Sequence, residues 1–463
     1  MIEKVVAGNL NDIVNPVFRS YAARYVDIEQ RFRESVSSQG LPFGQIEDRV
    51  SPEEARRTGR AGCMREGAPV LPEGLAAYRG RGLVIANDGK SYFANWQSEA
   101  CANCRLGLNA KTFLFSTQCP RRCFFCFNPN QTEHSRSAGF MHDAVKELEE
   151  FHGRGRECTH LALTGGEPLI HAEETVRFFQ RARELYPEAH TRLYTSGAFL
   201  DEPLMRRLGD AGLREIRFSI KTEDEPAAME GTLAVIDRSK SYVPDVMVEM
   251  PVVPGELALM KRLLVRLDGI GVAGINLLEL GYPFANAEAF ARRGLGIKPD
   301  PLRVLYNYQY AGGLPVAGSE EACLLLLEFA LDEGLRLGVH YCSMENKFSG
   351  QIYQQNAPHA KRFPPCVMSQ KDHFLKSALA FGDDAACAAK LFRDGGASGA
   401  RRREEVDALE FSPDCIALLA GEFPDMEVAL SYSVVELREG SWVQREVRID
   451  RTTPGKFDLD SDM

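Results

Sequence analysis

The stretch Cys119-Pro-Arg-Arg-Cys123-Phe-Phe-Cys126 limits the fold and chemistry of this chain more than any other part of the sequence. It follows the strand-like run Thr112–Thr117, so it is expected to form the loop at the end of a strand. Its three thiolates can bind three irons of a cubane cluster, whereas such clusters normally have four cysteine ligands. The spacing therefore predicts a [4Fe-4S] cluster with one open iron, whose coordination a small molecule completes.

A second motif lies one strand further along the chain. Leu161-Ala-Leu-Thr164-Gly165-Gly166-Glu167-Pro168 is a short apolar strand that runs into a Gly-Gly turn with a carboxylate. Glycines allow the backbone to approach a ligand closely, and exposed peptide groups together with Glu167 can accept hydrogen bonds from an ammonium group. Taken alone, such a turn is a weak signal, because Gly and Pro also mark plain turns. Placed one strand after the cysteines, it predicts a binding site for an amino acid.

Together the two motifs resemble the signature of the radical S-adenosylmethionine (SAM) superfamily, including the aromatic Phe125 before the third cysteine. The resemblance implies that Cys119, Cys123 and Cys126 hold a [4Fe-4S] cluster. It also implies that the methionyl amino group of SAM is bound by Thr164, Gly165, Gly166 and Glu167. The resemblance covers about residues 95–370, and within the superfamily the chain is similar to a subgroup related to the pyruvate formate-lyase activating enzyme.

Strand-like runs alternate with helical stretches through the middle of the chain. The runs are Thr112–Thr117, Thr159–Thr164, Thr191–Thr195, Glu215–Ile220, Asp245–Val252 and Gly274–Leu280. Strands alternating with helices predict an α/β fold with a parallel sheet. Asp143 and Asp201, the latter followed by Pro203, are expected to begin two of the helices. The resemblance implies the partial (β/α)6 TIM-like barrel of radical SAM enzymes, with both motifs at the carboxyl ends of strands, where barrels carry function.

Other strand ends supply further candidate residues. Hydroxyl groups of Thr195 and Ser196 are placed to meet the ribose of SAM, unless they form an ordinary turn. The resemblance implies that the SAM carboxylate or ribose contacts Ser219 and Lys221, although exposed lysines are usually only solvated. The last strand resembles the one whose backbone flanks adenine, and either Asn276 or Glu279 points into the barrel, depending on register. A charge there needs a partner, so Glu279 is a candidate ligand for the substrate.

Two cysteines upstream of the signature leave a zinc site open as an alternative. Cys104 and Cys123 enclose 18 residues, so Cys101, Cys104, Cys123 and Cys126 also match a zinc-ribbon pattern. That interpretation leaves Cys119 unused and does not account for the Gly-Gly turn.

The outlying cysteines also raise the question of a second metal site. Cys342, within His340-Tyr-Cys342-Ser343, and Cys366 follow the expected barrel. The subgroup resemblance places a Cys-x2-Cys pair ahead of the signature and a His-Tyr-Cys-Ser beyond the barrel. A second iron–sulfur cluster or a zinc ion is therefore expected on Cys101, Cys104, Cys342 and Cys366. The alternative is that Cys342 and Cys366 are small buried hydrophobes, as free cysteines often are.

Composition narrows the class of protein. The chain has 463 residues, of which 44% are hydrophobic and 26% charged, so it is long enough for a large core and further small domains. Its net charge of −10 and the lack of a long basic stripe argue against a nucleic-acid partner. The N-terminus lacks the apolar segment of a signal peptide, and no long apolar run occurs. We therefore expect a cytoplasmic protein that is not associated with a membrane. Twelve cysteines in such a chain favour metal ligands or reduced thiols over disulfides.

The expected organisation has four parts. They are an N-terminal extension over 1–105 with Cys101 and Cys104, the barrel over 106–300, a C-terminal extension over 301–393 with Cys342 and Cys366, and a small β-containing cap over 406–463. A turn at Asn87-Asp88-Gly89 predicts a hairpin of 83–86 with 91–94. A helix is expected around Val17–Val36, strands at Glu427–Leu437 and Trp442–Asp450, and a flexible linker at 394–399. The basic run Arg401–Arg403 is interpreted as a solvated helix start.

The resemblance implies an enzyme that reductively cleaves SAM to a 5′-deoxyadenosyl radical, which abstracts hydrogen from a peptide, a protein or a small metabolite. Such oxidoreductase or transferase chemistry needs an electron donor, such as a flavodoxin or a ferredoxin. A glycyl-radical-enzyme activase is one alternative, although the chain is much longer than a minimal activase. A cobalamin-dependent methylase is disfavoured, because no additional nucleotide-binding βα domain precedes the signature. A non-catalytic iron–sulfur or zinc-binding redox protein is the alternative from another class.

Overall fold

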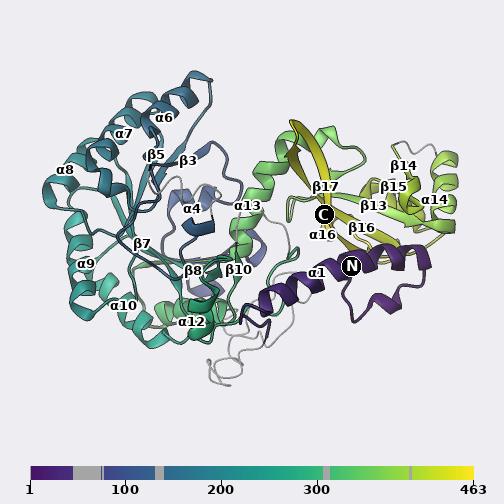
Figure 1. Cartoon of the computed structure of the whole chain (residues 1–463), viewed down its shortest axis with the longest axis horizontal. Helices are drawn as coiled ribbons and strands as arrows, with labels where there is room; N and C mark the ends of the chain where they lie inside the picture. The colour runs from purple at the N-terminus through teal and green to yellow at the C-terminus, as the bar shows by residue number, and fades with distance from the viewer. Residues whose placement is uncertain (1, 45–74, 76–77, 131–139, 306–312, 396–398) are drawn as a thin grey trace.

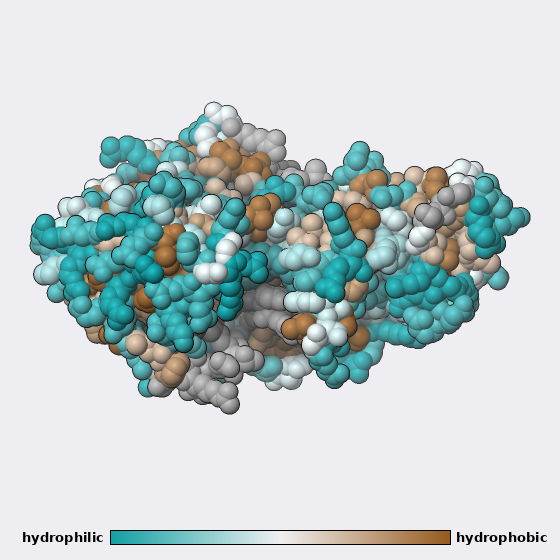
Figure 2. Space-filling view, turned by 90° about the horizontal axis from the view of Figure 1, so that it is seen from above, coloured by the Kyte–Doolittle hydropathy of each residue, from teal (hydrophilic) through white to brown (hydrophobic). Residues whose placement is uncertain are grey.

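The computed structural model describes residues 2–44, 75, 78–130, 140–305, 313–395 and 399–463. The molecule has two lobes, an α/β lobe that contains the middle of the chain and a smaller C-terminal lobe built on an antiparallel sheet (Figure 1). The surface seen in Figure 2 is mainly hydrophilic, with hydrophobic side chains in small scattered groups. Within the described residues, no helix is both long and apolar enough to cross a membrane.

A nine-stranded sheet forms the α/β lobe, in the order β1-β2-β11-β8-β7-β6-β5-β4-β3. Its strands are β1 (Leu83–Ala86), β2 (Ser91–Ala94), β3 (Ala110–Leu114), β4 (His160–Thr164), β5 (His190–Thr195), β6 (Glu215–Phe218), β7 (Asp245–Val252), β8 (Gly274–Glu279) and β11 (Gly338–Cys342). Neighbours from β3 to β8 and on to β11 are parallel, whereas β2 is antiparallel to β11 and β1 to β2. The expected α/β fold with a partial barrel is confirmed, and each of the six predicted strands is present.

Helices cover the outside of this sheet (Figure 1). They are α6 (Ala144–Gly153), α7 (Ala172–Leu185), α8 (Glu202–Asp210), α9 (Pro226–Ser239), α10 (Leu257–Ile270) and α12 (Ser319–Asp332). The shorter α4 (Glu99–Asn103) lies on the inner side, where its Cys101 contacts Arg217 of β6. The other helices that follow barrel strands are α11 (Ala287–Arg292) and α13 (Met344–Asn356). The predicted N-caps are confirmed, since Asp143 accepts from Lys146 N and Asp201 from Leu204 N.

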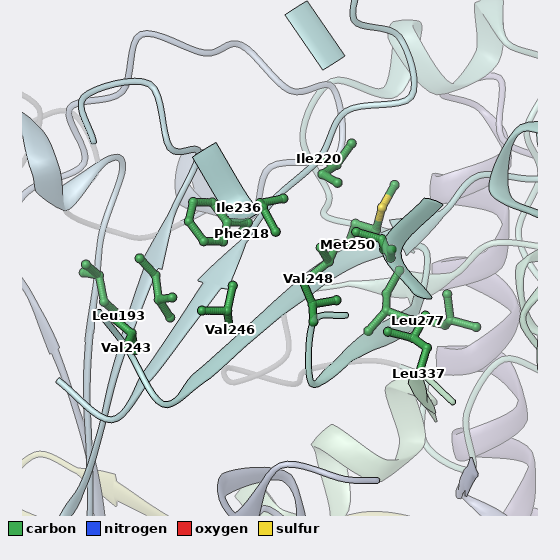
Figure 3. Close-up of a cluster of buried hydrophobic side chains, with 14 of the residues drawn as sticks. Leu193, Phe218, Ile220, Ile236, Val243, Val246, Val248, Met250, Leu277 and Leu337 are labelled. Carbon is green, nitrogen blue, oxygen red and sulfur yellow. The ribbon is translucent and has the colours of Figure 1, made fainter. Parts of the chain in front are cut away.

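Apolar residues on the outward face of the strands make the core of this lobe. Phe218, Val248 and Leu277 are fully buried and pack in one cluster with Ile236 of α9 (Figure 3). Residues next to these on each strand have the opposite orientation and point into the barrel. Polar side chains such as Arg217 of β6 and Asn276 of β8 therefore face its interior. This alternation places the candidate site inside the barrel and the hydrophobic core outside it.

The sheet extends beyond the six expected strands. β11 pairs in parallel with β8 and in antiparallel fashion with β2, so Cys342 ends a barrel strand and does not lie beyond the barrel. The predicted hairpin is confirmed as β1 and β2, and it forms the edge of the same sheet. All five residues of β11 are buried, which explains why this strand belongs to the sheet interior.

The C-terminal lobe contains a second sheet in the order β14-β15-β13-β16-β17, with β12 on β13, and short strands β9 and β10 pair elsewhere. The bounds are β9 (Gly281–Tyr282), β10 (Leu314–Pro315), β12 (Val367–Met368), β13 (Leu375–Phe381), β14 (Arg401–Arg403), β15 (Ala408–Phe411), β16 (Val428–Arg438) and β17 (Ser441–Thr452), with helices α14 (Gly382–Asp394), α15 (Ile416–Leu419) and α16 (Leu459–Asp462). The two predicted C-terminal strands are confirmed as β16 and β17. The sheet also takes β13 from the region expected as an extension, so 406–463 supplies only part of it.

The prediction of a helix start at Arg401–Arg403 is wrong. These residues form the edge strand β14, which pairs with β15. Arg401 lies 2.5 Å from the buried carboxylate of Glu410, and this ion pair holds the basic run against the sheet. Of the linker predicted just before it, residues 396–398 lie outside the described residues.

Helix α1 (Pro16–Ser37) connects the two lobes (Figure 1). Near its N-terminus, Phe18 stacks on Phe381 of β13 with ring centroids 5.0 Å apart. Near its C-terminus, Val36 packs in a cluster with Leu280 and Tyr282 of the α/β lobe. The predicted helix is thus confirmed, and it buries apolar side chains against both lobes.

Ser319 provides a test of how the carboxyl ends of β7 and β8 are held. Its buried hydroxyl donates to Val252 O (2.8 Å) and accepts from Leu280 N (2.7 Å). Ser319→Ala leaves both backbone groups without this partner, so the free energy of local opening should fall by about 1–3 kcal/mol. Hydrogen exchange of the peptide 274–282 measures this change. The exposed Ser35→Ala should have no effect, and equal exchange in both variants would contradict this role of Ser319.

Candidate functional site

The cysteine loop and the Gly-Gly turn lie backbone to backbone at the ends of the neighbouring strands β3 and β4. Gly166 N donates to Ser116 O (2.8 Å), and Glu167 N donates to Gln118 O (2.7 Å). A Cβ at Gly166 would overlap the Gln118 carbonyl oxygen, and one at Gly165, where φ is +156°, would crowd Ser116 O. Glycines are therefore required here because the turn approaches the backbone that leads into Cys119.

The three signature cysteines share one loop and influence one another. Cys119 is exposed, whereas Cys123 and Cys126 are half-buried. Burial raises the pKa of the Cys119 and Cys126 thiols, and the neighbouring Cys123 raises both further. Because metal ions bind thiolates, a cationic cluster would supply the charge that favours the deprotonated form. Three free thiols in one loop, close enough to affect one another electrostatically, are compatible with the expected [4Fe-4S] cluster.

Aromatic and ionic contacts anchor this loop to the barrel. Phe124 is buried and packs edge-on against Phe290 of α11 with ring centroids 5.0 Å apart. Arg121 lies 2.5 Å from Asp224, just beyond the end of β6. These contacts attach the loop to the barrel on both sides of Cys123.

Glu167 joins the turn to the end of β5. Its carboxylate accepts from Thr195 Oγ1 (2.7 Å) and from both the backbone N (2.7 Å) and Oγ (2.5 Å) of Ser196. The structure thus brings Glu167, Thr195 and Ser196 together. In this arrangement the Glu167 carboxylate positions Thr195 and Ser196. The sequence analysis had considered these two hydroxyl groups separately, as contacts of the SAM ribose. Thr164 ends β4 beside them and pairs with Leu114.

Lys221 lies beside the cysteine loop. Its Nζ is 5.0 Å from the ring centroid of Phe125, it donates to Ser219 Oγ, and its charge lowers the pKa of the Cys126 thiol. A cation next to the expected cluster can bind an anionic group. Lys221 therefore lies beside the signature loop with Ser219, and their expected contact with the carboxylate or ribose of SAM stays a prediction.

Asn276 and Glu279 lie in different surroundings. Asn276 Nδ2 donates to Cys101 Sγ (3.1 Å) and Glu249 Oε2 (2.7 Å), so it belongs to a network inside the barrel. Glu279 accepts from Met344 N (2.8 Å) and lies 3.5 Å from Lys298 Nζ. Burial raises the pKa of Glu279, and the cation of Lys298 opposes that shift. Lys298 is therefore the cationic partner that the buried carboxylate of Glu279 requires.

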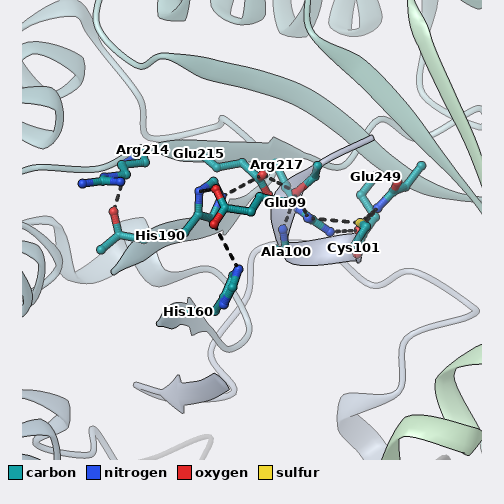
Figure 4. Close-up of polar contacts among 12 residues, drawn as sticks. Glu99, Ala100, Cys101, His160, His190, Arg214, Glu215, Arg217 and Glu249 are labelled. Carbon is teal, nitrogen blue, oxygen red and sulfur yellow. Dashed lines mark hydrogen bonds and ion pairs between the residues drawn. The ribbon is translucent and has the colours of Figure 1, made fainter. Parts of the chain in front are cut away.

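A buried polar network, absent from the sequence prediction, fills the barrel around Arg217 (Figure 4). Its guanidinium lies 2.5 Å from both Glu215 Oε1 and Glu249 Oε2, and its Nη2 donates to Cys101 Sγ (3.4 Å). Burial works against the charged form of Glu215, but Arg217 and hydrogen bonds to the carboxylate lower its pKa to about 2. Polar residues at alternate positions of a strand, here Glu215, Arg217 and Ser219, were the signal that sequence analysis could have used.

The structure brings Cys101, Cys104 and Cys342 together but places Cys366 elsewhere. Burial, together with Cys104 at the C-cap of α4 and Cys101 within that helix, raises the pKa of Cys342 to about 12. Asn346 donates to Cys342 Sγ (3.3 Å). Cys366 instead accepts from Gln444 of β17 (3.1 Å), and its recorded partners all lie in the C-terminal lobe. Cys366 therefore lies apart from the other three cysteines, and a metal site on Cys101, Cys104 and Cys342 stays a prediction.

Gly166→Ala tests the backbone contact between the turn and the cysteine loop. The added methyl group must displace Gln118, so we expect loss of bound iron as well as weaker SAM binding. Anaerobic reconstitution followed by iron and sulfide analysis measures the first effect. The control is Gly231→Ala, where an added Cβ meets nothing within 4 Å. Full iron content in Gly166→Ala would contradict the proposed clash.

The part of the chain that carries the cysteine loop and the Gly-Gly turn is similar to known proteins. Residues 113–258 match the family model of the radical SAM superfamily. A protein of Methanocaldococcus jannaschii, provisionally named a glycyl-radical enzyme activating enzyme, is 26% identical over 296 residues, which are 62% of this chain and 74% of that protein. PqqA peptide cyclase of Granulibacter bethesdensis is 30% identical over 118 residues, which are 25% of this chain and 30% of the cyclase.

Among solved structures, coproporphyrinogen III oxidase from Escherichia coli, a radical SAM enzyme, aligns with 14% identity and a TM-score of 0.34 over 52% of this chain and 58% of the oxidase. The family match begins on β3 and includes both the cysteine loop and the Gly-Gly turn that is hydrogen-bonded to the backbone leading into it. Residues 113–258 therefore form a radical SAM domain.

Proposed function

We propose that the protein cleaves SAM reductively and uses the resulting radical to abstract hydrogen from a peptide or protein substrate. The observation that carries this proposal is the backbone contact of the Gly-Gly turn with the loop of Cys119, Cys123 and Cys126. It holds three thiols and a candidate amino-acid site side by side. When bound, the cluster and SAM supply the one-electron step that yields methionine and a 5′-deoxyadenosyl radical, with the electron coming from a flavodoxin or ferredoxin type of donor.

The chain's own residues position SAM in this proposal. Carbonyl oxygens of the Gly165–Gly166 turn accept from the ammonium group in this proposal, and Glu167 holds Thr195 and Ser196 for contact with the ribose. The cation of Lys221, next to Phe125, binds the carboxylate of SAM. Each contact orients the ligand, and none requires an acid or a base.

A peptide or protein substrate is supported by the names of two relatives. One is provisionally an activating enzyme for glycyl-radical enzymes, and the other is a peptide cyclase. The match to the cyclase spans under a third of that protein, so it supports the substrate class and not the reaction. Activation of a glycyl-radical enzyme is the second candidate function, supported by the longer match.

We also propose a second metal centre, bound by Cys101, Cys104 and Cys342. Arg217 and Asn276 donate to Cys101 Sγ, and Asn346 donates to Cys342 Sγ. Hydrogen bonds to ligand sulfurs tune the potential of iron–sulfur clusters. Three cysteine ligands favour a [4Fe-4S] cluster with an open iron, with zinc as the alternative metal. Cys366 is omitted, because its contacts are with the C-terminal sheet.

Substitution of the signature cysteines tests the main proposal. Cys119→Ala, Cys123→Ala and Cys126→Ala each leave two protein ligands for the cluster, too few to hold it with SAM as the other chelator. After anaerobic reconstitution and reduction with dithionite, each variant should produce no 5′-deoxyadenosine. Cys387→Ala changes an exposed cysteine of α14 and should retain full activity. Wild-type production by Cys123→Ala would refute the assignment.

Iron analysis tests the second centre. With two cubanes the wild type should contain about eight irons per chain, and the signature triple variant and Cys101→Ala/Cys104→Ala about four each, by the four-iron count of each cubane. Because the structure places Cys366 elsewhere, Cys366→Ala should keep all eight. Four irons in the wild type without zinc would eliminate the second centre, whereas zinc lost only from the Cys101/Cys104 variant would make it a zinc site.

A further inference from the structure

Arg192 of β5 is a charged side chain inside the barrel that the proposed function does not use. Leu193 packs in the outer core (Figure 3), so Arg192 and Tyr194, on either side of it, point inward. The Cζ of Arg192 lies 5.6 Å from the ring centroid of Tyr194. Among the described residues, the Arg192 side chain forms no hydrogen bond or ion pair, and its Nε is buried without a partner. Because a cation inside a protein is costly unless an anion meets it, Arg192 is a candidate for binding one.

The carboxylate beside Arg192 in the sheet is already bonded to other residues. In the register of β5 and β6, Arg192 lies opposite Glu215. Oε1 of Glu215 is 2.5 Å from the guanidinium of Arg217, and its Oε2 accepts from Ser98 Oγ (2.5 Å). Arg217 also takes the inward carboxylate of Glu249, at 2.5 Å. The nearby carboxylates of β6 and β7 therefore pair with Arg217 and leave Arg192 unmatched.

The interior next to Arg192 is accessible. Arg192 and Tyr194 of β5 and Glu249 of β7 are only half-buried although they point inward, and Cys104 at the C-cap of α4 is exposed. At the same time, burial raises the pKa of Tyr194 to about 12 and raises the pKa of the Cys104 thiol. Side chains that the protein surrounds but does not fully cover lie beside an internal opening. A small group can therefore reach Arg192 inside the barrel.

A second cation, Lys347 of α13, faces the same part of the barrel. Within the part of the chain that the structure describes, its side chain has no hydrogen bond or salt bridge. Burial raises the pKa of Glu249, whereas the charges of Arg217 and Lys347 lower it. The charges of Arg192 and Lys347 both act on the Cys104 thiol as well. Lys347 therefore lies within electrostatic reach of the groups that surround Arg192.

A carboxylate is the peptide group that these two cations suit best. A guanidinium binds a carboxylate through two parallel hydrogen bonds, and an ammonium adds a further donor as a point charge. The position is also suitable for a substrate. From Arg192 the strand β5 leads to Thr195 and Ser196, next to the Gly-Gly turn, which is roughly 10 Å along the strand. A group held at Arg192 thus lies deeper in the barrel than the proposed SAM site.

We propose that Arg192 and Lys347 bind a carboxylate of the peptide or protein substrate inside the barrel. The carboxylate belongs to an aspartate or glutamate side chain or to the end of the substrate chain. This inference rests on the proposed function and deepens it, because it identifies the chemical class of the substrate residue that enters the barrel.

Fragments with a single carboxylate test the inference. The full chain, with its iron–sulfur sites reconstituted and SAM present, is titrated anaerobically with N-acetylglutamate amide, N-acetylglycine and the neutral N-acetylglutamine amide, and binding is followed by saturation-transfer NMR. We expect at least one acidic fragment to bind about 10-fold or more tightly than the neutral one, as charge-assisted hydrogen bonds imply. Preference for N-acetylglutamate amide identifies an acidic side chain as the source, and preference for N-acetylglycine identifies a chain end.

Variants assign this preference to the two cations. Arg192→Gln should abolish it, Lys347→Met should reduce it, and Arg192→Lys should keep part of it because the charge remains. Arg177→Gln, which removes an exposed arginine of α7, should bind all three fragments like the wild type. Unchanged affinity for the neutral fragment and normal iron content show that a variant is folded.

Equal binding of the three fragments by the wild type would overturn the inference, as would a preference for acidic fragments that survives Arg192→Gln. The readout requires no cleavage of SAM. A wild type that prefers acidic fragments but forms no 5′-deoxyadenosine would therefore contradict the proposed function and leave the carboxylate site standing.

Discussion

The site depends on one close approach of the chain to itself, between the Gly165-Gly166 turn and the backbone of residues 116–118. Two hydrogen bonds join the segments, and no side chain fits between them. This contact places a cysteine loop and an amino-acid-binding turn next to each other at the ends of two parallel strands. Glu167 then extends the arrangement to β5 by holding Thr195 and Ser196. Substitutions at the glycines should therefore act on the cluster and on SAM together.

The interior of the barrel is held by a different interaction, the pairing of Arg217 with Glu215 and Glu249. Removing one partner of a buried ion pair is strongly destabilising, by about 3–5 kcal/mol, because the other charge is left uncompensated. Arg217 links two features of the molecule that are distant in sequence. Through Cys101 it contacts the proposed second centre, and through Glu215 it is linked to His190 at the start of β5. Its position explains how α4 is fixed inside the barrel.

Sequence patterns predicted the six central strands, because each combines β-branched or apolar residues with a turn and a following helix. They also predicted that Glu167, Lys221 and the signature cysteines would lie at one end of the sheet, since carboxyl ends of parallel strands meet there. The partner of the glycines could not be predicted, because the sequence does not show which backbone approaches the turn. The hydrogen bonds of Glu167 to Thr195 and Ser196 could not be predicted either, because they depend on how β4 and β5 lie side by side.

Other features depend on contacts between distant segments. β11 was placed beyond the barrel, because a long segment separates it from β8 and five buried residues give no alternation to recognise. Cys366 was grouped with Cys342 by proximity in sequence, whereas its contacts are with β17. A helix start at Arg401–Arg403 was predicted from the local charge alone. Pairing with β15 and the ion pair to Glu410 instead make this segment a strand. Polar residues inside the barrel were missed for the same reason, since their partners lie on neighbouring strands.

The most direct test of the central claim asks whether SAM binds the open iron of the signature cluster. Electron-nuclear double resonance of the reduced, reconstituted protein with SAM labelled with ¹⁵N at its amino group reports contact between that nitrogen and the cluster. A strong ¹⁵N coupling that disappears in the Gly166→Ala and Cys123→Ala variants is the predicted result. A cluster whose spectrum is unchanged by SAM and shows no nitrogen coupling would contradict the account.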